Sequence, residues 1–564
     1  MKRVISVFIF ASLLVSFARA QSRCLTPMFE PAKKALAEQY GGSHGPSDLT
    51  NDITSHEVGD TISFWCWDLT VMPPVWIRVL STCRAVTENS YIFVADDQWN
   101  VHMDQADVDQ VAYYWEEGTY NDSTGGIYQL NTENFGLPPD ELDHDDHIYI
   151  FYSELGSFGG SVFDGYFSVF NEYTEEEAQG MGGHSNEVEM FYMSCQPGDP
   201  VSALRISVLA HEFEHMIHWA ADPNEDSWVD EGCAEYAMLL FGVPDPLVDF
   251  PGNPDINLTV WNNQFADYIK TFMFFTYLSD HYGGAPMIQQ IVQEPENSFY
   301  GVQAALDDMS YEVSFEEVFV NWTIANFYHG RGGADSPQPD SQYIYYSIDP
   351  PAFHVSDWHT TYPAGPNNRF VNNWAADYIV FGNPNGNFNR LSVDFANSSS
   401  NLFGLGIVQF DVDDNMNAEQ LYPVTEDWSD EFDDFGQDQF VAMLVSAPEA
   451  QGNHNYSYQA DVAVGIDSPA PTAQAFALGQ PYPNPFNRTT AIKLSKPIGQ
   501  MARLEVYDVA GRLVERWSIG ESQDRAEILW SGENGRGKPV ASGVYFFKLS
   551  SGEASQIARV TLLK

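Results

Sequence analysis

Hydrophobic residues cluster in several short runs within residues 21–200, and polar stretches separate these runs. The runs lie at residues 61–69, 90–95 and 147–152. Short runs rich in β-branched and aromatic residues are typical of strands, and few stretches in this part of the chain show the period of a helix. We therefore expect a mixed sheet whose strands are connected by loops.

Between Pro200 and about Phe327 the spacing of apolar residues changes to the period of an α-helix. Pairs four positions apart are Leu204 and Val208, Ala234 and Met238, Phe272 and Thr276, and Phe315 and Phe319. The sequence therefore predicts a helical subdomain after the sheet, with a cleft between the two halves.

Residues 352–466 return to short strand-like runs separated by turns rich in Gly and Asn. This pattern predicts a β-sandwich. One turn contains Asp411, Asp413 and Asn415, whose alternating oxygens resemble a Ca²⁺ loop but lack its Gly and its distal Glu. A solvated turn is the favoured interpretation, and Ca²⁺ binding stays open.

The last part of the chain differs in composition from the rest. Residues 467–479 are rich in Pro, Ala, Ser and Thr, which is typical of an extended linker. Residues 480–564 hold twelve Lys or Arg against eight Asp or Glu, whereas residues 21–479 hold only ten Lys or Arg. Short alternating runs between turn residues predict a separate, small β-sandwich of Ig-like size.

The first twenty residues have the three parts of a secretory signal peptide: Lys2 and Arg3, an apolar run, and a small-residue site ending at Ala20. Residues 21–60 then form an N-terminal segment that could be a propeptide. Cys24 is not preceded by the small residues of a lipoprotein signal. No later stretch approaches the roughly 20 apolar residues of a membrane-spanning helix, so we expect a secreted protein.

Charge and cysteine usage narrow the possible functions. The net charge of −54 argues against nucleic acid or an anionic membrane as a partner, since both attract basic surfaces. Five cysteines are too few for a disulfide scaffold. Cys66 and Cys83 lie in adjacent strand-like runs, and they could either form a disulfide or stay free.

The strongest chemical signal is the run His211-Glu212-Phe213-Glu214-His215. Residues four apart on a helix lie on one face, about 6 Å apart along the axis, so both imidazoles can reach one metal ion. His218 is about 10 Å from His211 along that axis, too far to share the ion. A catalytic zinc site needs a third protein ligand and an open position for water.

A second helical pattern begins near Ser227, which is placed as its N-cap, and contains Glu231 and Glu235. Both glutamates face one way, so spacing alone does not decide which is a ligand. The sequence Trp228-Val-Asp-Glu-Gly, following the His-Glu-x-x-His helix, resembles the gluzincins, the clan of thermolysin, certain aminopeptidases, and the immune-inhibitor-A and hyicolysin-like secreted peptidases. The resemblance implies that Glu231 is the third ligand and that Glu235 orients a ligand histidine.

The same resemblance extends to Tyr268-Ile-Lys-Thr-Phe, which is similar to a Tyr-x-Lys-Gly-Phe stretch in aminopeptidases of the clan. It implies that Tyr268 donates a hydrogen bond to the transition state, although Thr271 replaces the family glycine. Tyr268 could also be one more core aromatic residue. For residues 61–335 the resemblance implies a zincin-type peptidase domain. Residues 188–194 would be the edge strand that pairs with the substrate.

These residues together predict a secreted zinc-dependent endopeptidase with one Zn²⁺ per chain. Two imidazoles and a carboxylate suit zinc, and a zinc-activated water with Glu212 as general base would hydrolyse peptide bonds of a protein or peptide substrate. Two alternatives stay open: an aminopeptidase of the same clan, and a surface adhesin or structural protein with an inactive peptidase domain.

The tail carries a second resemblance. The runs Tyr482-Pro-Asn-Pro-Phe-Asn, Val506-Tyr-Asp-Val-Ala-Gly-Arg and Ser542-Gly-Val-Tyr-Phe are similar to the C-terminal Ig-like domain of many bacterial secreted proteins, which is related to the flagellar hook-capping domain FlgD and to type IX secretion sorting domains. This implies a bacterial extracellular or cell-surface location and a secretion or attachment machinery as partner.

Overall fold

The structure is a computed structural model. It describes residues 22–41, 55–69, 71, 74–140, 142–158, 161–336, 340–399, 401–410, 415–433, 435–437, 439–463, 477–479, 481, 483–496, 501–509, 512–520, 525–536, 538–551 and 554–563. The expected signal peptide, Asp411 and Asp413 of the Ca²⁺-like turn, and most of the expected linker lie outside these residues. The chain divides into two compact units, residues 1–463 and 464–564.

The first unit begins with a mixed sheet of eight strands. Their order is β1 (Ser22–Cys24), β7 (Ser161–Phe167), β8 (Met190–Ser194), β5 (Ile148–Ser153), β4 (Ser90–Ala95), β3 (Val75–Val86) and β2 (Thr61–Asp68), with β6 (Ser157–Phe158) paired to β7. Every residue of β4, β5 and β8 is buried, because these central strands are covered on both faces.

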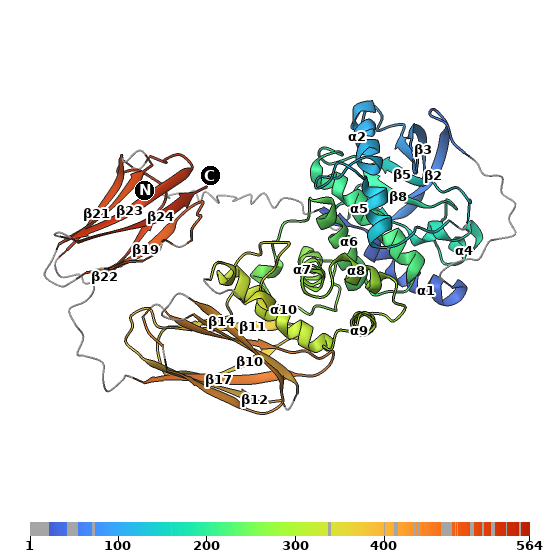
Figure 1. The fold of residues 1–564 in the computed structure, drawn as a ribbon. Helices are drawn as coiled ribbons and strands as arrows, with labels where there is room; N and C mark the ends of the chain where they lie inside the picture. Colours follow the sequence, from blue (N-terminus) through green and yellow to red (C-terminus); the bar gives the residue numbers. More distant parts are fainter. Residues whose placement is uncertain are drawn as a thin grey trace, which may run out of the picture. The chain divides into compact units, whose positions relative to one another are not determined.

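Helices pack on this sheet through aromatic side chains. The helices before the His-Glu-x-x-His motif are α1 (Glu30–Tyr40), α2 (Gln105–Glu116), α3 (Ile127–Asn134) and α4 (Glu175–Gly180). The ring of Trp115 in α2 lies 5.9 Å from that of Phe191 in β8 and 4.9 Å from that of Phe213 in α5 (Ala203–Ala221). Figure 1 shows α2 and α5 alongside these strands. The position of the His-Glu-x-x-His motif relative to the sheet therefore depends on buried aromatic packing.

The structure corrects the expected edge strand. The strand β8, which covers most of residues 188–194, lies inside the sheet between β7 and β5. The strand next to the metal motif at that side is β7, and it is β7 that accepts a further strand, β1, in parallel orientation. Alternation cannot reveal this order, because neighbours in a sheet are chosen by packing rather than by local sequence.

The helical subdomain contains α5 (Ala203–Ala221), α6 (Ser227–Phe241), α7 (Phe265–His281), α8 (Ala285–Val292), α9 (Phe299–Asp308) and α10 (Phe315–Gly330). At Gly232 of α6, an added Cβ would lie 2.3 Å from the ring of Phe275 in α7. The glycine therefore allows α6 and α7 to approach closely. Ser227 is the first residue of α6 rather than its N-cap, which is Asp226, and the Ser227 hydroxyl donates to Glu30 of α1.

The predicted sandwich after the helices consists of two sheets. One contains β10 (Ala364–Val371), β17 (His454–Ala463), β12 (Arg390–Asn397) and β15 (Trp428–Phe432), and the other contains β14 (Met416–Val424), β13 (Phe403–Phe410), β16 (Phe440–Ser446), β11 (Ala376–Gly382) and β9 (Asp357–His359). The outer face of the second sheet packs on α10, where Cβ atoms added to Gly404 and Gly406 would meet Val320 and Ile324. The sandwich therefore belongs to the first compact unit (Figure 1).

Of the two possibilities left open for Cys66 and Cys83, the structure shows the free thiols and not the disulfide. All five cysteines lie in the described residues and all five are free and buried. Cys66 of β2 pairs with Ile77 of β3, while Cys83 lies beyond the end of this ladder, six positions farther along β3. The antiparallel register thus places the two thiols too far apart along the strands to be bridged.

The C-terminal unit is a small two-sheet structure of its own. One sheet contains β18 (Ala477–Leu478), β19 (Thr490–Ser495) and β22 (Arg525–Trp530), and the other contains β21 (Leu513–Ile519), β20 (Ala502–Asp508), β23 (Gly543–Ser551) and β24 (Ala554–Leu562). Its core includes Leu504, Trp530 and Phe547. The chain is therefore multidomain and mixed α and β, with several sheets.

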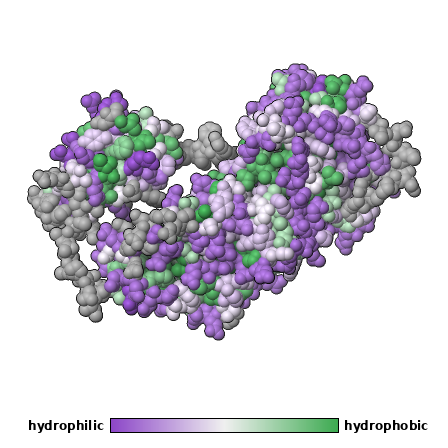
Figure 2. Space-filling view, in the orientation of Figure 1, coloured by the Kyte–Doolittle hydropathy of each residue, from purple (hydrophilic) through white to green (hydrophobic). Residues whose placement is uncertain are grey.

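Exposed surfaces are mainly polar. In the view of Figure 2 hydrophilic residues cover most of the face shown, in keeping with the net charge of −54. Within the described residues, no helix combines the length and the apolar character that crossing a bilayer requires.

Candidate metal centre

The two histidines of the His-Glu-x-x-His motif lie one turn apart in the middle of α5. Their Nε2 atoms are 3.1 Å apart. The helix continues without interruption for a full turn beyond His215, and nearly all of its residues from Arg205 to Trp219 are buried. Both imidazoles are therefore held in one direction by a rigid, buried helix.

Glu231 of α6 faces both histidines. Its Oε2 lies 3.3 Å from Nε2 of His211, and its Oε1 lies 3.5 Å from Nε2 of His215. Ligands about 2.0–2.1 Å from a tetrahedral zinc ion lie roughly 3.3 Å from one another. The three side chains therefore already have the mutual spacing of zinc ligands.

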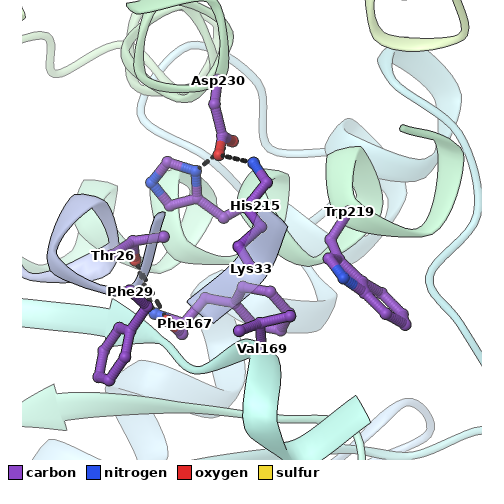
Figure 3. Close-up of a pocket in the computed structure, with 8 residues that line it drawn as sticks. All are labelled: Thr26, Phe29, Lys33, Phe167, Val169, His215, Trp219 and Asp230. Carbon is purple, nitrogen blue, oxygen red and sulfur yellow. Dashed lines mark hydrogen bonds and ion pairs between the residues drawn. The ribbon is translucent and has the colours of Figure 1, made fainter. Parts of the chain in front are cut away.

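A second layer of carboxylates orients the two rings. Nδ1 of His211 lies 3.4 Å from Oε1 of Glu235, and Nδ1 of His215 donates to Oδ1 of Asp230 at 2.7 Å. Lys33 of α1 binds the other oxygen of Asp230 at 2.5 Å. Figure 3 shows the Asp230 carboxylate between the His215 ring and the Lys33 amine. The hydrogen bond to Asp230 fixes the tautomer of His215 in which Nε2 is free to bind a metal, while Glu235 is the carboxylate that faces Nδ1 of His211.

Glu212 lies beside this group, on the side of strand β7. A Cβ added to Gly165 of β7 would lie 2.9 Å from Oε1 of Glu212, so the absence of a side chain at Gly165 makes room for the carboxylate. Glu212 is 0% exposed, and its Oε1 has no hydrogen-bond partner. A buried carboxylate with a free oxygen can accept a proton from a bound water.

Tyr268 is in the first turn of α7 and is 3% exposed. Its hydroxyl donates to the backbone carbonyl of Cys24 at 2.9 Å, and Cys24 Sγ is close to the histidine pair. Thr271, which replaces the family glycine, donates its hydroxyl to the backbone carbonyls of Asp267 and Tyr268. The threonine is thus accommodated within the helix without displacing Tyr268 from the site.

The charges in the site act strongly on one another. Burial lowers the pKa of His211 to about 4, and the neighbouring His215 acts in the same direction. Burial also acts to lower the pKa of His215, but Asp230 and Glu231 outweigh it and raise the pKa to about 10. Burial raises the pKa of Glu231 to about 8. Without a cation, the site therefore retains protons that a metal ion would displace.

The donor set fits a zinc ion. Both oxygens of Glu231 are buried and lack a hydrogen-bond partner, which is costly unless another ligand satisfies them. Atoms of Cys24, His211, His215 and Glu231 all lie within 4.8 Å of one another. Imidazole, carboxylate and thiolate are all ligands that zinc accepts. The structure thus brings together His211, His215 and Glu231, with Glu212 and Tyr268 beside them.

Three further residues lie near the proposed ligands. His218 is not one of the ligands, and the sequence did not assign Asp230 or Cys24 to the site. His218 is paired with Glu214, at 3.3 Å between Nδ1 and Oε1, and it does not contact His211. Asp230 could have been noticed only as the acidic neighbour of Glu231. Cys24 gave no sequence signal beyond being one of an odd number of cysteines, because its approach to the site depends on tertiary contact.

Comparisons with solved structures give only weak similarity. The chain is 19% identical to PorZ, a surface component of the type-IX secretion system of Porphyromonas gingivalis, covering 20% of this chain and 14% of PorZ at a TM-score of 0.12. It is 13% identical to latent PorU from the same organism, and the match covers 37% of this chain and 19% of PorU at a TM-score of 0.15. A β-glucuronidase from Parabacteroides merdae is 9% identical, and the match covers 31% of this chain and 26% of the glucuronidase at a TM-score of 0.12. The chain thus spans about a quarter or less of each of these proteins, and scores this low do not indicate a shared fold.

No curated protein matches the chain. A family model does match within the C-terminal unit, where β20 and β23 form the centre of its larger sheet. Residues 487–555 match the FlgD Ig-like domain, which confirms the Ig-like part of the resemblance drawn from the tail sequence.

Proposed function

We propose that the protein is a zinc-dependent endopeptidase, with His211, His215 and Glu231 as metal ligands. The observation that carries this proposal is the convergence of two Nε2 atoms and one carboxylate at 3.1–3.5 Å from one another. Glu235 and Asp230 support the two rings from behind. Every one of these groups is buried, so the arrangement is held by the fold rather than by solvent-exposed side chains.

Zinc bound at these ligands would lower the pKa of a coordinated water and polarise the scissile carbonyl. Glu212 would take a proton from that water and later deliver one to the leaving amine. The Tyr268 hydroxyl, which in the structure donates to a peptide carbonyl, would donate to the carbonyl oxygen of the substrate as negative charge develops there. Exclusion of water by the surrounding core would strengthen both interactions.

An endopeptidase is favoured over an aminopeptidase because a polypeptide passes through the site on both sides of the metal group. Residues Ser22 and Arg23 pair with β7 before Cys24, and Leu25 continues the backbone pairing after it, with its N–H donating to the carbonyl of Gly165 at 3.2 Å. An aminopeptidase must end its cleft at the free amine of the substrate. Hydrolysis of N-terminally blocked peptides, compared with free ones, tests this choice.

We further propose that the C-terminal unit directs export or surface attachment in a bacterial host. Its match to the FlgD Ig-like domain and its resemblance to type IX sorting domains support this role. The three metal-ligating residues, Glu212 and Tyr268 all belong to the first compact unit. The adhesin alternative would gain support from a protein that binds zinc but shows no hydrolysis of any peptide.

The central test combines metal analysis with the variant Glu212→Gln. The wild-type chain should bind about one zinc per molecule. The variant should keep this metal and lose at least about a hundredfold in turnover of a blocked peptide, because it removes the general base. Glu214→Gln is a matched control, since Glu214 is equally buried in the same helix but pairs with His218. A folded wild-type chain without metal, or normal turnover in Glu212→Gln, would contradict the proposal.

A further inference from the structure

The N-terminal segment occupies the sheet edge beside the metal group. In β1, Ser22 pairs with Val162, Arg23 with Phe163, and Cys24 with Gly165 of β7. An extended peptide adds to an exposed sheet edge through such backbone pairing. The edge that a substrate would use is therefore already filled by residues of the same chain.

Cys24 brings its thiol to the remaining side of the ligand group. Its Sγ lies 3.5 Å from Nε2 of His215 and 3.4 Å from Oε2 of Glu212, and it belongs to one cluster with His211, His215 and Glu231. A thiolate at about 2.3 Å and an imidazole at about 2.0 Å from a tetrahedral zinc are roughly 3.5 Å apart. The thiol is thus at the distance expected of a fourth ligand.

The same segment also contacts the two groups assigned to catalysis. Thr26 donates its hydroxyl to Oε2 of Glu212 at 3.2 Å, and the carbonyl of Cys24 accepts the hydrogen bond of Tyr268 at 2.9 Å. The proposed general base, Glu212, and the proposed oxyanion donor, Tyr268, are therefore both hydrogen-bonded to the N-terminal segment. A substrate carbonyl could reach Tyr268 only after this segment has left.

Helix α1 fastens the segment to the beginning of α6. Lys33 pairs with Asp230 and Lys34 with Asp226, each at 2.5 Å, while Leu25 and Leu36 are fully buried. With these residues in place, His211 is 2% and Glu231 1% exposed. The ion pair between Lys33 and Asp230 links α1 directly to the site, because Asp230 also accepts the hydrogen bond of His215, a proposed ligand.

We propose that residues 22–40 are an intramolecular inhibitor and that Cys24 is the fourth zinc ligand of a latent enzyme. This inference rests on the proposed zinc site. A thiolate in the fourth position takes the place that a catalytic water needs, while β1 fills the cleft. Activity then requires that the thiol leave the metal and that the segment leave β7.

The experiment uses Co²⁺ as a spectroscopic probe in the chain without residues 1–20. Wild-type protein loaded with Co²⁺ should show a sulfur-to-metal charge-transfer band in the near ultraviolet. Cys24→Ser should bind as much Co²⁺ without this band. Cys66→Ser is the matched control and should keep it, because Cys66 is equally buried but lies in β2. Cys24→Ala provides a second variant that adds no polar group to the buried position.

The same variants test inhibition. Cys24→Ala should hydrolyse a blocked peptide at least about tenfold faster than wild type, because a larger fraction of chains has an open cleft; mass spectrometry establishes that residues 21–40 are still attached. Bound Co²⁺ without the band in wild type, or unchanged hydrolysis in Cys24→Ala, would overturn this inference and leave the zinc site standing. Failure of wild type and of both folded Cys24 variants to bind Co²⁺ would overturn the proposed function as well.

Discussion

The candidate metal centre and the C-terminal unit differ in whether their buried polar side chains all have hydrogen-bond partners. In α5 and α6, buried oxygen or nitrogen atoms of Glu212, Glu214, His218, Glu231 and Glu235 have no hydrogen-bond partner. In the described part of the C-terminal unit, no buried side-chain oxygen or nitrogen lacks one. An unsatisfied buried polar group costs about 1–3 kcal/mol. A cation bound by Glu231 would offset this cost for the two carboxylate oxygens of that residue.

The largest effect on the candidate metal centre is expected from removing the carboxylates of α6 one at a time. Glu231→Ala should lower zinc affinity by more than about a hundredfold, since loss of an outer-shell partner alone costs about ten- to a hundredfold. Glu235→Ala, which removes the partner of His211 Nδ1, should fall within that smaller range, and saturating zinc should restore occupancy. Dialysis of both variants against one weak chelator, followed by metal analysis, measures the difference. If Glu235→Ala lost its zinc and Glu231→Ala retained it, the ligand assignment would be wrong by one helical turn.

Tyr268→Phe removes a hydroxyl from the same buried region without touching a ligand. In the Cys24→Ala background, turnover should fall by about a hundredfold, which is typical for loss of one oxyanion donor, while zinc content stays unchanged. Steady-state kinetics should place the loss mainly in kcat, because the hydrogen bond strengthens in the transition state. An unchanged kcat would return Tyr268 to the role of a core aromatic residue.

The protons retained by the site predict that its zinc affinity depends on pH. In the metal-free protein the pKa of Glu231 is about 8 and that of His215 about 10, so both groups are protonated at neutral pH and zinc must displace their protons. Zinc affinity should therefore rise with pH, by about tenfold per pH unit for each displaced proton. Competition titrations at several pH values measure the slope. A pH-independent affinity would contradict the assignment of these two ligands.

The smallest effect is expected from deleting residues 480–564. Zinc content and turnover should stay within about twofold of the full-length values, because the C-terminal unit packs as a separate unit and contains none of the proposed site residues. Secretion or surface retention in the host should change instead. Loss of activity in a truncated chain that still folds and binds zinc would show that the C-terminal unit contributes to the cleft.

The two sheets of the sandwich that follows the helices show where pattern reasoning was sufficient and where it was not. In β12, alternate positions from Leu391 to Phe395 are buried, so period-two spacing revealed the strand. In β11 all seven residues are buried, because one face packs on the opposite sheet and the other face on the helical subdomain. Nothing in the local pattern of residues 376–382 indicates which element covers that second face.

For the site, the sequence by itself determined that His211 and His215 share a helix face and that α6 follows with two glutamates one turn apart. These are consequences of the 3.6-residue period. Helical spacing left Glu231 and Glu235 equivalent and only the family resemblance favoured Glu231, whose carboxylate faces both Nε2 atoms in the structure. The tertiary structure alone decided that β7 rather than β8 borders the site and that Cys24 enters it. The physical reason is that these outcomes depend on the packing of distant segments: Cys24 contacts a residue 188 positions away, and no local periodicity records such a contact.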